Sequence, residues 1–185
     1  EETKKNRFLL RNKEDGDYNQ YWYSNNTIEI MVDEIVNQIQ STKVAFLSTP
    51  SIHYSIAKDK RGDNIVFDFD EKLKKKDNAF VLYDFNKPKE VDSSMHGFFD
   101  VIVVDPPFIT RDVWEKYAET MKLLGTKDCK YICTTIAENE DMMNEILGVT
   151  PTKFLPSIPN LVYQYRLYTN YDSVNFSKKN PEIPE

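Results

Sequence analysis

A short motif of an acid, two prolines and an aromatic residue, Asp105-Pro106-Pro107-Phe108, follows the largely apolar run at 98–104. A strand buried on both faces of a parallel sheet has such a composition. Proline continues neither a strand nor a helix, so we expect Asp105 at the carboxyl edge of the sheet, where open α/β folds bind ligands. A carboxylate and a rigid proline carbonyl can accept both hydrogens of an amino group, and Phe108 offers a flat face to a ring or an alkylammonium stem. The motif therefore predicts an amine-binding site; the alternative is a proline-rich turn with no chemical role.

The side chains of Asp70, Asp84 and Asp105 are expected near that edge, because each of these acids ends a predicted strand. Asp70 follows the second strand and can accept both hydrogen bonds of a ribose diol, with Asp68 as the second choice on the same face. Asp84 follows the third strand and can accept from an adenine amino group, with Phe85 against the ring. Taken singly, each acid is also compatible with a turn or a helix cap.

The turn after the first predicted strand, Ser48-Thr49-Pro50-Ser51, contains no glycine, and none occurs between Gly16 and Gly62. Nucleotide diphosphates are usually bound by glycine-rich turns, so this sequence argues against NAD and ATP. Small hydroxyl side chains still allow close approach of a ligand and can donate to a carboxylate. Ser48, Thr49 and Pro50 are therefore candidates for binding the methionine end of a nucleoside cofactor.

Strands and helices alternate along the chain, which predicts an α/β fold with a mostly parallel, doubly wound sheet. A helix with Asn26 as its N-cap and Glu29 as capping-box partner is expected first. Further helices are expected at 110–124 and 139–147, strands at 43–49, 65–70, 80–84, 99–105 and 130–136, and an antiparallel C-terminal hairpin of 152–155 and 163–171 joined by 156–160. Residues 1–19 and 174–185 are expected as tails around one domain at 20–173.

Composition limits the partners. The 185 residues suit a single domain, and 24 basic against 30 acidic residues give a net charge of −6. Nucleic-acid binders usually carry a basic face, so the balance argues against a duplex substrate, although a local basic patch remains compatible with it. The run Lys72–Lys76 is expected to be a solvated loop.

Metal binding and membrane insertion are not expected. Cys129 and Cys133 read as buried thiols, and His53 and His96 stand alone, so no ligand set is completed. No stretch has the apolar length of a membrane span, and the first residues do not form a signal peptide. These features predict a cytoplasmic protein in a reducing environment.

Several motifs together resemble the eukaryotic lysine methyltransferases of translation elongation factor 1-alpha, a family first labelled N6-adenine DNA methyltransferase from its D-P-P-Y/F motif. The resemblance runs from about Gln20 to Ser173. It rests on Tyr21-Trp22-Tyr23-Ser24, Ser48-Thr49-Pro50-Ser51, Phe67-Asp68-Phe69-Asp70, Tyr83-Asp84-Phe85-Asn86, Val104-Asp105-Pro106-Pro107-Phe108 and Asn170-Tyr171-Asp172. The chain departs from the family at Phe108, where tyrosine is common, and in the lysine-rich loop.

The resemblance implies a Rossmann-like class I methyltransferase fold with a seven-stranded sheet, helices on both faces, and S-adenosylmethionine as donor. It assigns Trp22, Tyr23 and Ser24 to the methionine end of the cofactor, although an aromatic plug before the first helix is an equal alternative. It makes the 105–108 motif catalytic and elongation factor 1-alpha the protein partner. Two other functions stay open: N6-methylation of adenine in DNA or RNA, in which Phe108 would stack on a flipped base, and an inactive methyltransferase-like binding module.

Overall fold

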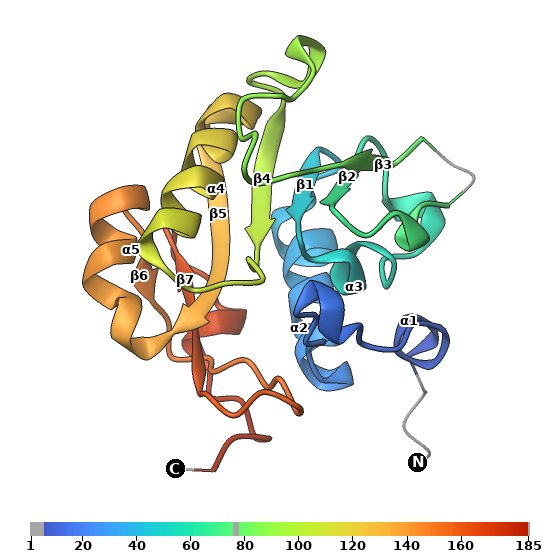
Figure 1. Ribbon diagram of the computed structural model, residues 1–185. Coiled ribbons are helices and arrows are strands. Elements are labelled where there is room, and N and C mark those ends of the chain that lie inside the picture. Colours follow the sequence, from blue (N-terminus) through green and yellow to red (C-terminus); the bar gives the residue numbers. More distant parts are fainter. Residues whose placement is uncertain (1–5, 76–77, 185) are drawn as a thin grey trace.

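A seven-stranded sheet forms the centre of the protein, whose structure is a computed structural model that describes residues 6–75 and 78–184 (Figure 1). Its strand order is β3-β2-β1-β4-β5-β7-β6. Strands β1 to β5 pair with one another in parallel, and β7 is antiparallel to β5 and to β6, which confirms the predicted mostly parallel sheet. The strands are β1 (Val44–Leu47), β2 (Ile65–Asp68), β3 (Phe80–Leu82), β4 (Phe99–Val104), β5 (Gly125–Ile136), β6 (Thr150–Pro151) and β7 (Tyr165–Thr169).

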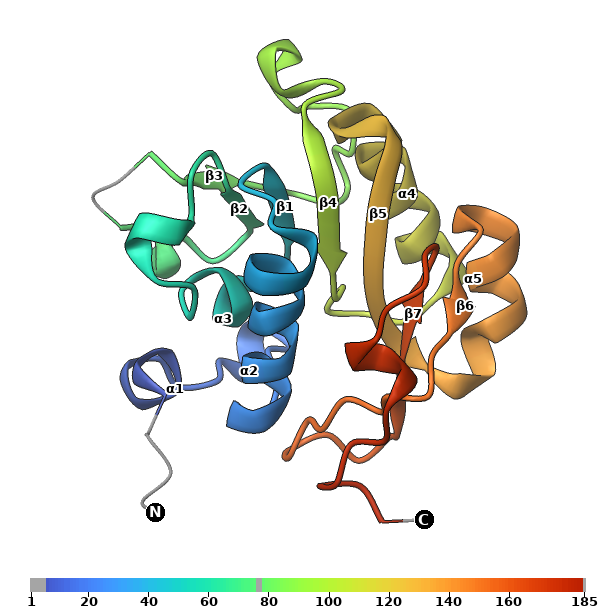
Figure 2. The ribbon, with the colours of Figure 1, turned by 180° about the vertical axis from the view of Figure 1, so that it is seen from behind.

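Helices cover both faces of the sheet, as expected (Figures 1 and 2). Val44 and Phe46 of β1 pack into the layer of α2 and α3, while Ala45 and Leu47 pack into the layer of α4 and α5. Alternate residues of a strand point to opposite faces, so β1 must be apolar throughout. The helices are α1 (Arg7–Arg11), α2 (Asn25–Asp33) with a π-helical continuation (Glu34–Ile39), α3 (Pro50–His53), α4 (Arg111–Leu124) and α5 (Glu140–Leu147).

The first long helix begins earlier than the sequence suggested. Ser24, not Asn26, is the N-cap of α2: its backbone is extended, with φ −62° and ψ 158°, and its hydroxyl accepts a hydrogen bond from the Thr27 amide. The Asn26 side chain donates instead to Asn180 and Glu182. The prediction of Asn26 as the cap was therefore wrong, because the C-terminal segment, far away in the sequence, takes up the Asn26 amide.

This cap leads to a test of stability. We expect Ser24→Ala to lower the free energy of unfolding by about 1 kcal/mol, because the first turn of α2 loses its acceptor. Ser24→Thr keeps a hydroxyl at the same position and should retain most of the stability. Urea unfolding of the three proteins provides the measurement, and equal midpoints for all three would contradict the capping role.

The C-terminal hairpin exists, but one of its strands is shifted. Thr150 pairs with Thr169 and Pro151 with Tyr168, so the predicted strand at 152–155 was wrong and the connection between the two strands is 152–164. Phe154 instead packs against Phe176, with ring centroids 5.8 Å apart. The Thr152 amide still donates to the Leu167 carbonyl at 2.8 Å, but the Phe154 amide donates to the Phe176 carbonyl at 3.0 Å, so the chain pairs from there with the C-terminal segment instead of β7.

The described parts of both predicted tails pack on the domain. Phe8 of α1 is buried beside Trp22 and Tyr54, with ring centroids 5.2 Å and 6.0 Å away. At the other end, Phe176 and Asn180 are buried. Residues 1–5 and 185, and Lys76 of the lysine-rich run, lie outside the described residues. Within 6–75 and 78–184, no helix is both long and apolar enough to cross a membrane.

Candidate active site

The strand that precedes the acid–proline motif, β4, ends beside a cavity. β4 stops at Val104, and the Asp105 amide donates to the Leu47 carbonyl of β1 at 3.2 Å, so Asp105 lies at the carboxyl edge of the sheet. A cavity of about 560 Å³ opens there, and all four residues of the motif contribute to its wall. The other lining residues are Asp17, Tyr18, Asn19, Gln20, Tyr21, Trp22, Ser48, Asp68, Phe69, Tyr83, Asp84, Phe85, Asn86, Ile109, Thr110, Tyr117, Ile158, Leu161, Tyr163 and Tyr165.

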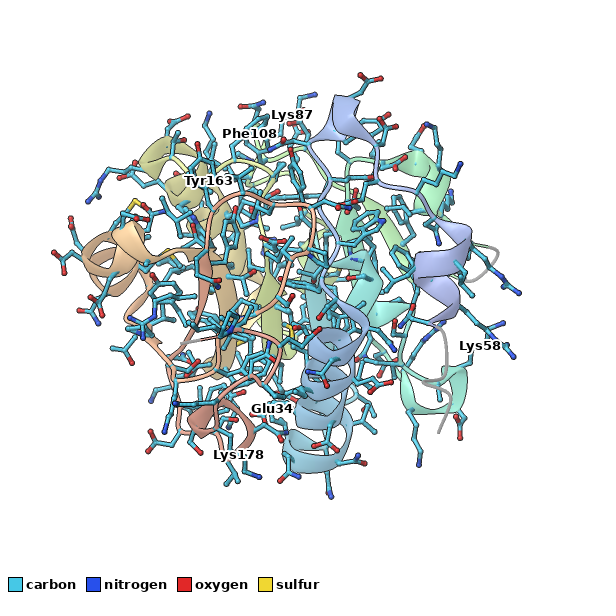
Figure 3. The ribbon with its side chains drawn as sticks, turned by 90° about the horizontal axis from the view of Figure 1, so that it is seen from below. Glu34, Lys58, Lys87, Phe108, Tyr163 and Lys178 are labelled. Atoms are coloured by element: carbon cyan, nitrogen blue, oxygen red, sulfur yellow. The ribbon has the colours of Figure 1, made fainter. Side chains whose placement is uncertain are left out.

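Aromatic side chains form part of the cavity wall and reach its outer surface. Phe108 is 49% exposed and meets Phe85 edge-on, with ring centroids 6.3 Å apart. Tyr163, from the connection between β6 and β7, is 67% exposed. Both lie toward the same edge of the view along the carboxyl ends of the strands (Figure 3). These flat apolar faces suit the stem of a long side chain.

Asp105 has an unusual environment for a carboxylate. Asp105 as a whole is half-buried against the cavity, but burial of its carboxyl group raises the pKa to about 8. Hydrogen bonding by Thr134 and Tyr23 lowers this pKa and only partly opposes the rise. The Tyr23 and Thr134 hydroxyl oxygens are 2.6 Å apart. A carboxyl group with such a pKa gains or loses its proton near neutral pH.

These pKa shifts make the stability of the ligand-free protein depend on pH. Burial raises the pKa of Asp68 to about 7 and of Asp105 to about 8, from an ordinary 3.8. The native state therefore binds more protons than the unfolded state between these values, and the free energy of unfolding should fall as pH rises from about 4 to about 8. Asp105→Asn removes one of the two groups, so we expect a shallower fall. Urea unfolding across this pH range measures both curves, and parallel curves would contradict the assignment.

The structure separates the two acids that follow β2. Asp68, the second choice from the sequence, lines the cavity and is buried. Asp70, the first choice, is not part of the wall: it caps the short helix Glu71–Leu73 and accepts a hydrogen bond from the Gln20 side chain at 2.9 Å. Asp84 and Phe85 both line the cavity, as expected. The geometry therefore favours Asp68 over Asp70 as the acid that meets a ligand.

In the turn after β1, a serine adopts the backbone conformation for which a glycine is usually needed. Ser48 has φ 60°, in the left-handed region that glycine usually occupies, and its hydroxyl lies 2.7 Å from the Tyr117 hydroxyl. It lines the cavity. Thr49 and Pro50 do not: Thr49 donates to the Val103 carbonyl at 3.2 Å, and Pro50 opens α3. Strained backbone of this kind is concentrated at functional sites.

The four residues before α2, Tyr21 to Ser24, have three different structural roles. Trp22 lines the cavity, and its indole nitrogen donates to the Asn12 carbonyl at 3.0 Å. Tyr23 is buried and does not line the cavity, but it acts on the carboxyl group of Asp105, which does. Ser24 caps the helix. Of this stretch, Tyr21 and Trp22 belong to the wall.

Sequence reasoning missed a segment that borders the cavity, 17–20, which it placed mostly in a tail. Asn19, with φ 54°, donates to the Pro107 carbonyl. Asp15 holds the same segment to Lys72 through an ion pair of 3.2 Å. No periodicity marks these residues, because they form a turn whose partners are distant in the chain. The one feature of this segment that could have indicated packing against the domain is the aromatic side chain of Tyr18.

Family comparison adds an independent observation. A family described as "Probable N6-adenine methyltransferase" matches residues 14–173. The chain belongs to this methyltransferase family. A mouse relative, EEF1A lysine methyltransferase 1, is 31% identical over 166 residues, covering 87% of this chain and 77% of the relative. Protein-lysine N-methyltransferase EFM5 of Saccharomyces cerevisiae is 30% identical over 182 residues, covering 86% and 73%.

Solved structures support the fold of this methyltransferase. A 1,6-didemethyltoxoflavin N1-methyltransferase from Burkholderia thailandensis, with S-adenosylhomocysteine bound, aligns with a TM-score of 0.54 and 11% identity, covering 77% of this chain and 76% of that one. A Corynebacterium glutamicum protein aligns with a TM-score of 0.52 and 9% identity, covering 90% and 94%. The predicted Rossmann-like class I fold is confirmed.

Across 6–75 and 78–184, no three His, Cys, Asp or Glu side chains come together as a metal site. Cys129 and Cys133 are buried and free.

Proposed function

We propose that this chain transfers a methyl group from S-adenosylmethionine to a lysine of translation elongation factor 1-alpha. The charge of the cavity carries the proposal: Asp17, Asp68, Asp84 and Asp105 line it, and none of the described lining residues is Lys, Arg or His. An ammonium group is attracted to ionised carboxylates, and its charge favours the ionised forms of Asp68 and Asp105, whereas a phosphate backbone requires basic contacts. The name of the mouse relative points to the same substrate, and the name of the yeast relative points to protein lysine.

The cavity fits S-adenosylmethionine, which supplies an electrophilic methyl group on a positively charged sulfur. Its volume suits a nucleoside cofactor together with the end of a side chain. Asp68 would accept the ribose hydroxyls, and Asp84 and Phe85 would hold the adenine. The left-handed turn at Ser48 allows backbone to approach the methionine end. Trp22 closes the wall beside it.

On the substrate side, each motif residue has a physical task. Asp105 and the Pro106 carbonyl accept the hydrogens of the target nitrogen, which fixes the direction of its lone pair. Holding reacting groups in this way accounts for much of a displacement's acceleration. Pro107 stiffens the turn, and Phe108 packs on the lysine stem.

Lysine must lose a proton before it can attack. Desolvation in the cavity lowers the pKa of a lysine from about 10.4. Burial has already raised the pKa of Asp105 to about 8, so the two groups are far closer in proton affinity than an ordinary lysine and aspartate. In its ionised form, which the charge of a bound ammonium group favours, Asp105 is thus suited to receive that proton.

The decisive experiment compares substrates. The protein is incubated with methyl-labelled S-adenosylmethionine and either purified elongation factor 1-alpha or oligonucleotides of DNA and RNA. We expect label on a lysine of the elongation factor and none on nucleic acid. Label on adenine alone would replace the proposal with the N6-adenine activity, and absence of cofactor binding in a calorimetric titration would favour an inactive binding module.

Tyr163 provides a test of the substrate side. We expect Tyr163→Ala to raise KM for the protein substrate by about tenfold, because loss of a large aromatic contact costs about 1–2 kcal/mol. The affinity for S-adenosylmethionine should stay unchanged. Tyr163→Phe, which keeps the ring, serves as the matched control. Equal KM values for the wild type and Tyr163→Ala would contradict a substrate contact.

A further inference from the structure

Two buried hydroxyl groups lie behind the acid of the motif, from different parts of the chain. Thr134 is on β5, and the register explains its position: Val104 pairs with Cys133, so the next residues, Asp105 and Thr134, fall side by side. Tyr23 comes from the segment before α2. The exposed fractions of Tyr23 and Thr134 are 3% and 1%. Neither is part of the cavity wall, yet both lie near enough to the Asp105 carboxyl group to act on it as hydrogen-bond donors, which lowers its pKa.

We propose that Tyr23 and Thr134 are positioning residues, which fix the orientation of the Asp105 carboxyl group for methyl transfer. The inference rests on the proposed function, in which that carboxyl group accepts the hydrogens of the target amine. It gives Tyr23 a role at the acid in place of the cofactor contact that the resemblance implied.

The Tyr23 and Thr134 hydroxyl groups and the Asp105 carboxyl group can supply one another with hydrogen-bond partners whether Asp105 is ionised or protonated. Each hydroxyl has one hydrogen, and the 2.6 Å contact between the Tyr23 and Thr134 oxygens requires one of them. The other hydroxyl hydrogen then goes to the ionised Asp105. This leaves lone pairs of Asp105 on the cavity side free for the amine. When Asp105 is protonated, it can donate to the pair, because hydroxyl oxygens also accept.

The arrangement matters because Asp105 is joined to a loop, and its side chain would otherwise rotate. A carboxylate that turns away from the cavity no longer aims the nitrogen, and a misplacement of about 1 Å can cost about a hundredfold in rate. Thr134 is fixed by β5 and Tyr23 by the segment before α2, so the pair of hydroxyl groups beside Asp105 is held by two elements. The other titratable groups whose charges interact with Asp105 among the described residues are the Tyr165 and Tyr117 phenols.

The chain offers a matched control for the test. Tyr83 and Thr120 form a second buried pair of hydroxyls, 2.7 Å apart, and Thr120 on α4 is not part of the cavity wall. Thr120→Val therefore makes the same chemical change as Thr134→Val, at a pair whose Tyr83 lines the cavity but whose hydroxyl groups do not act on the Asp105 carboxyl group. Thr134→Ser keeps the hydroxyl and loses only a methyl group.

The experiment measures the Asp105 titration and the turnover of Tyr23→Phe, Thr134→Val, Thr134→Ser and Thr120→Val. Carbon NMR of labelled aspartate, assigned with Asp105→Asn, follows the titration without substrate. We expect Thr134→Val and Tyr23→Phe to raise the pKa of Asp105 above that of the wild type, since each removes a hydrogen bond that lowers it. We expect kcat to fall by about tenfold to a hundredfold, as for lost hydrogen bonds to a charged group. Thr134→Ser should restore both, and Thr120→Val should leave the titration unchanged.

Two results would overturn the inference: an Asp105 titration that is the same in Thr134→Val, Tyr23→Phe and the wild type, or a loss of turnover equal in Thr134→Val and Thr120→Val. Failure of the proposed substrate is distinguishable, because the wild type would then not methylate the elongation factor. In that case the NMR titration alone decides whether Tyr23 and Thr134 hold Asp105.

Discussion

Replacing Asp105 with alanine should abolish methyl transfer while the protein remains folded and binds S-adenosylmethionine. In the proposed function the carboxyl group is the acceptor that faces the target nitrogen, and it lies beyond the end of β4 instead of in the apolar core. Loss of one preorganised polar contact to the reacting group typically lowers kcat by about a hundredfold to a thousandfold. Asp105→Asn, which keeps one acceptor oxygen, should retain more activity than Asp105→Ala.

Three measurements test this expectation: single-turnover rates with labelled cofactor, calorimetry with S-adenosylmethionine, and thermal unfolding. Burial disfavours the charged form of Asp105, so its removal should not lower the stability of the ligand-free protein at pH 8. Turnover by Asp105→Ala at the wild-type rate would refute the amine-binding role. A variant that no longer unfolds cooperatively would instead show that the acid serves the fold.

The second large effect concerns the two acids after β2. We expect Asp68→Asn to weaken S-adenosylmethionine binding by about tenfold to a hundredfold, because an amide offers a single acceptor oxygen where a ribose diol needs two. Asp70→Asn is the matched control. Asp70 lies two residues further on, caps the helix Glu71–Leu73 and bonds to Gln20, so its change should leave the affinity nearly intact.

Cofactor affinity should also depend on pH in a way that identifies Asp68. Burial raises the pKa of Asp68 to about 7, and the ionised form is the better double acceptor. Affinity in the wild type should therefore increase as pH rises from 6 to 8, and this dependence should be weaker in Asp68→Asn. A larger loss of affinity in Asp70→Asn than in Asp68→Asn would return the assignment to Asp70.

Much of the fold follows from local sequence. The apolar runs at β1 and β4 could only be central strands, because they are buried on both faces. The helices predicted at 110–124 and 139–147 are α4 and α5; α4 begins after its Thr110 cap and ends before Gly125, and α5 ends at Gly148 in the left-handed conformation. The position of Asp105 at the sheet edge was predictable for a similar reason, since two prolines fix where a strand ends.

Only the tertiary structure decided which polar groups meet. Asp68 and Asp70 are equivalent by strand alternation, but the chain turns after Asp68 and Asp70 becomes a helix cap. Tyr23 and Thr134 are separated by 111 positions, and nothing in either segment shows that their hydroxyl groups meet. Periodicity reports which face a side chain takes within its own element. Contacts between elements depend on register and loop path, and these are set by the packing of the whole chain.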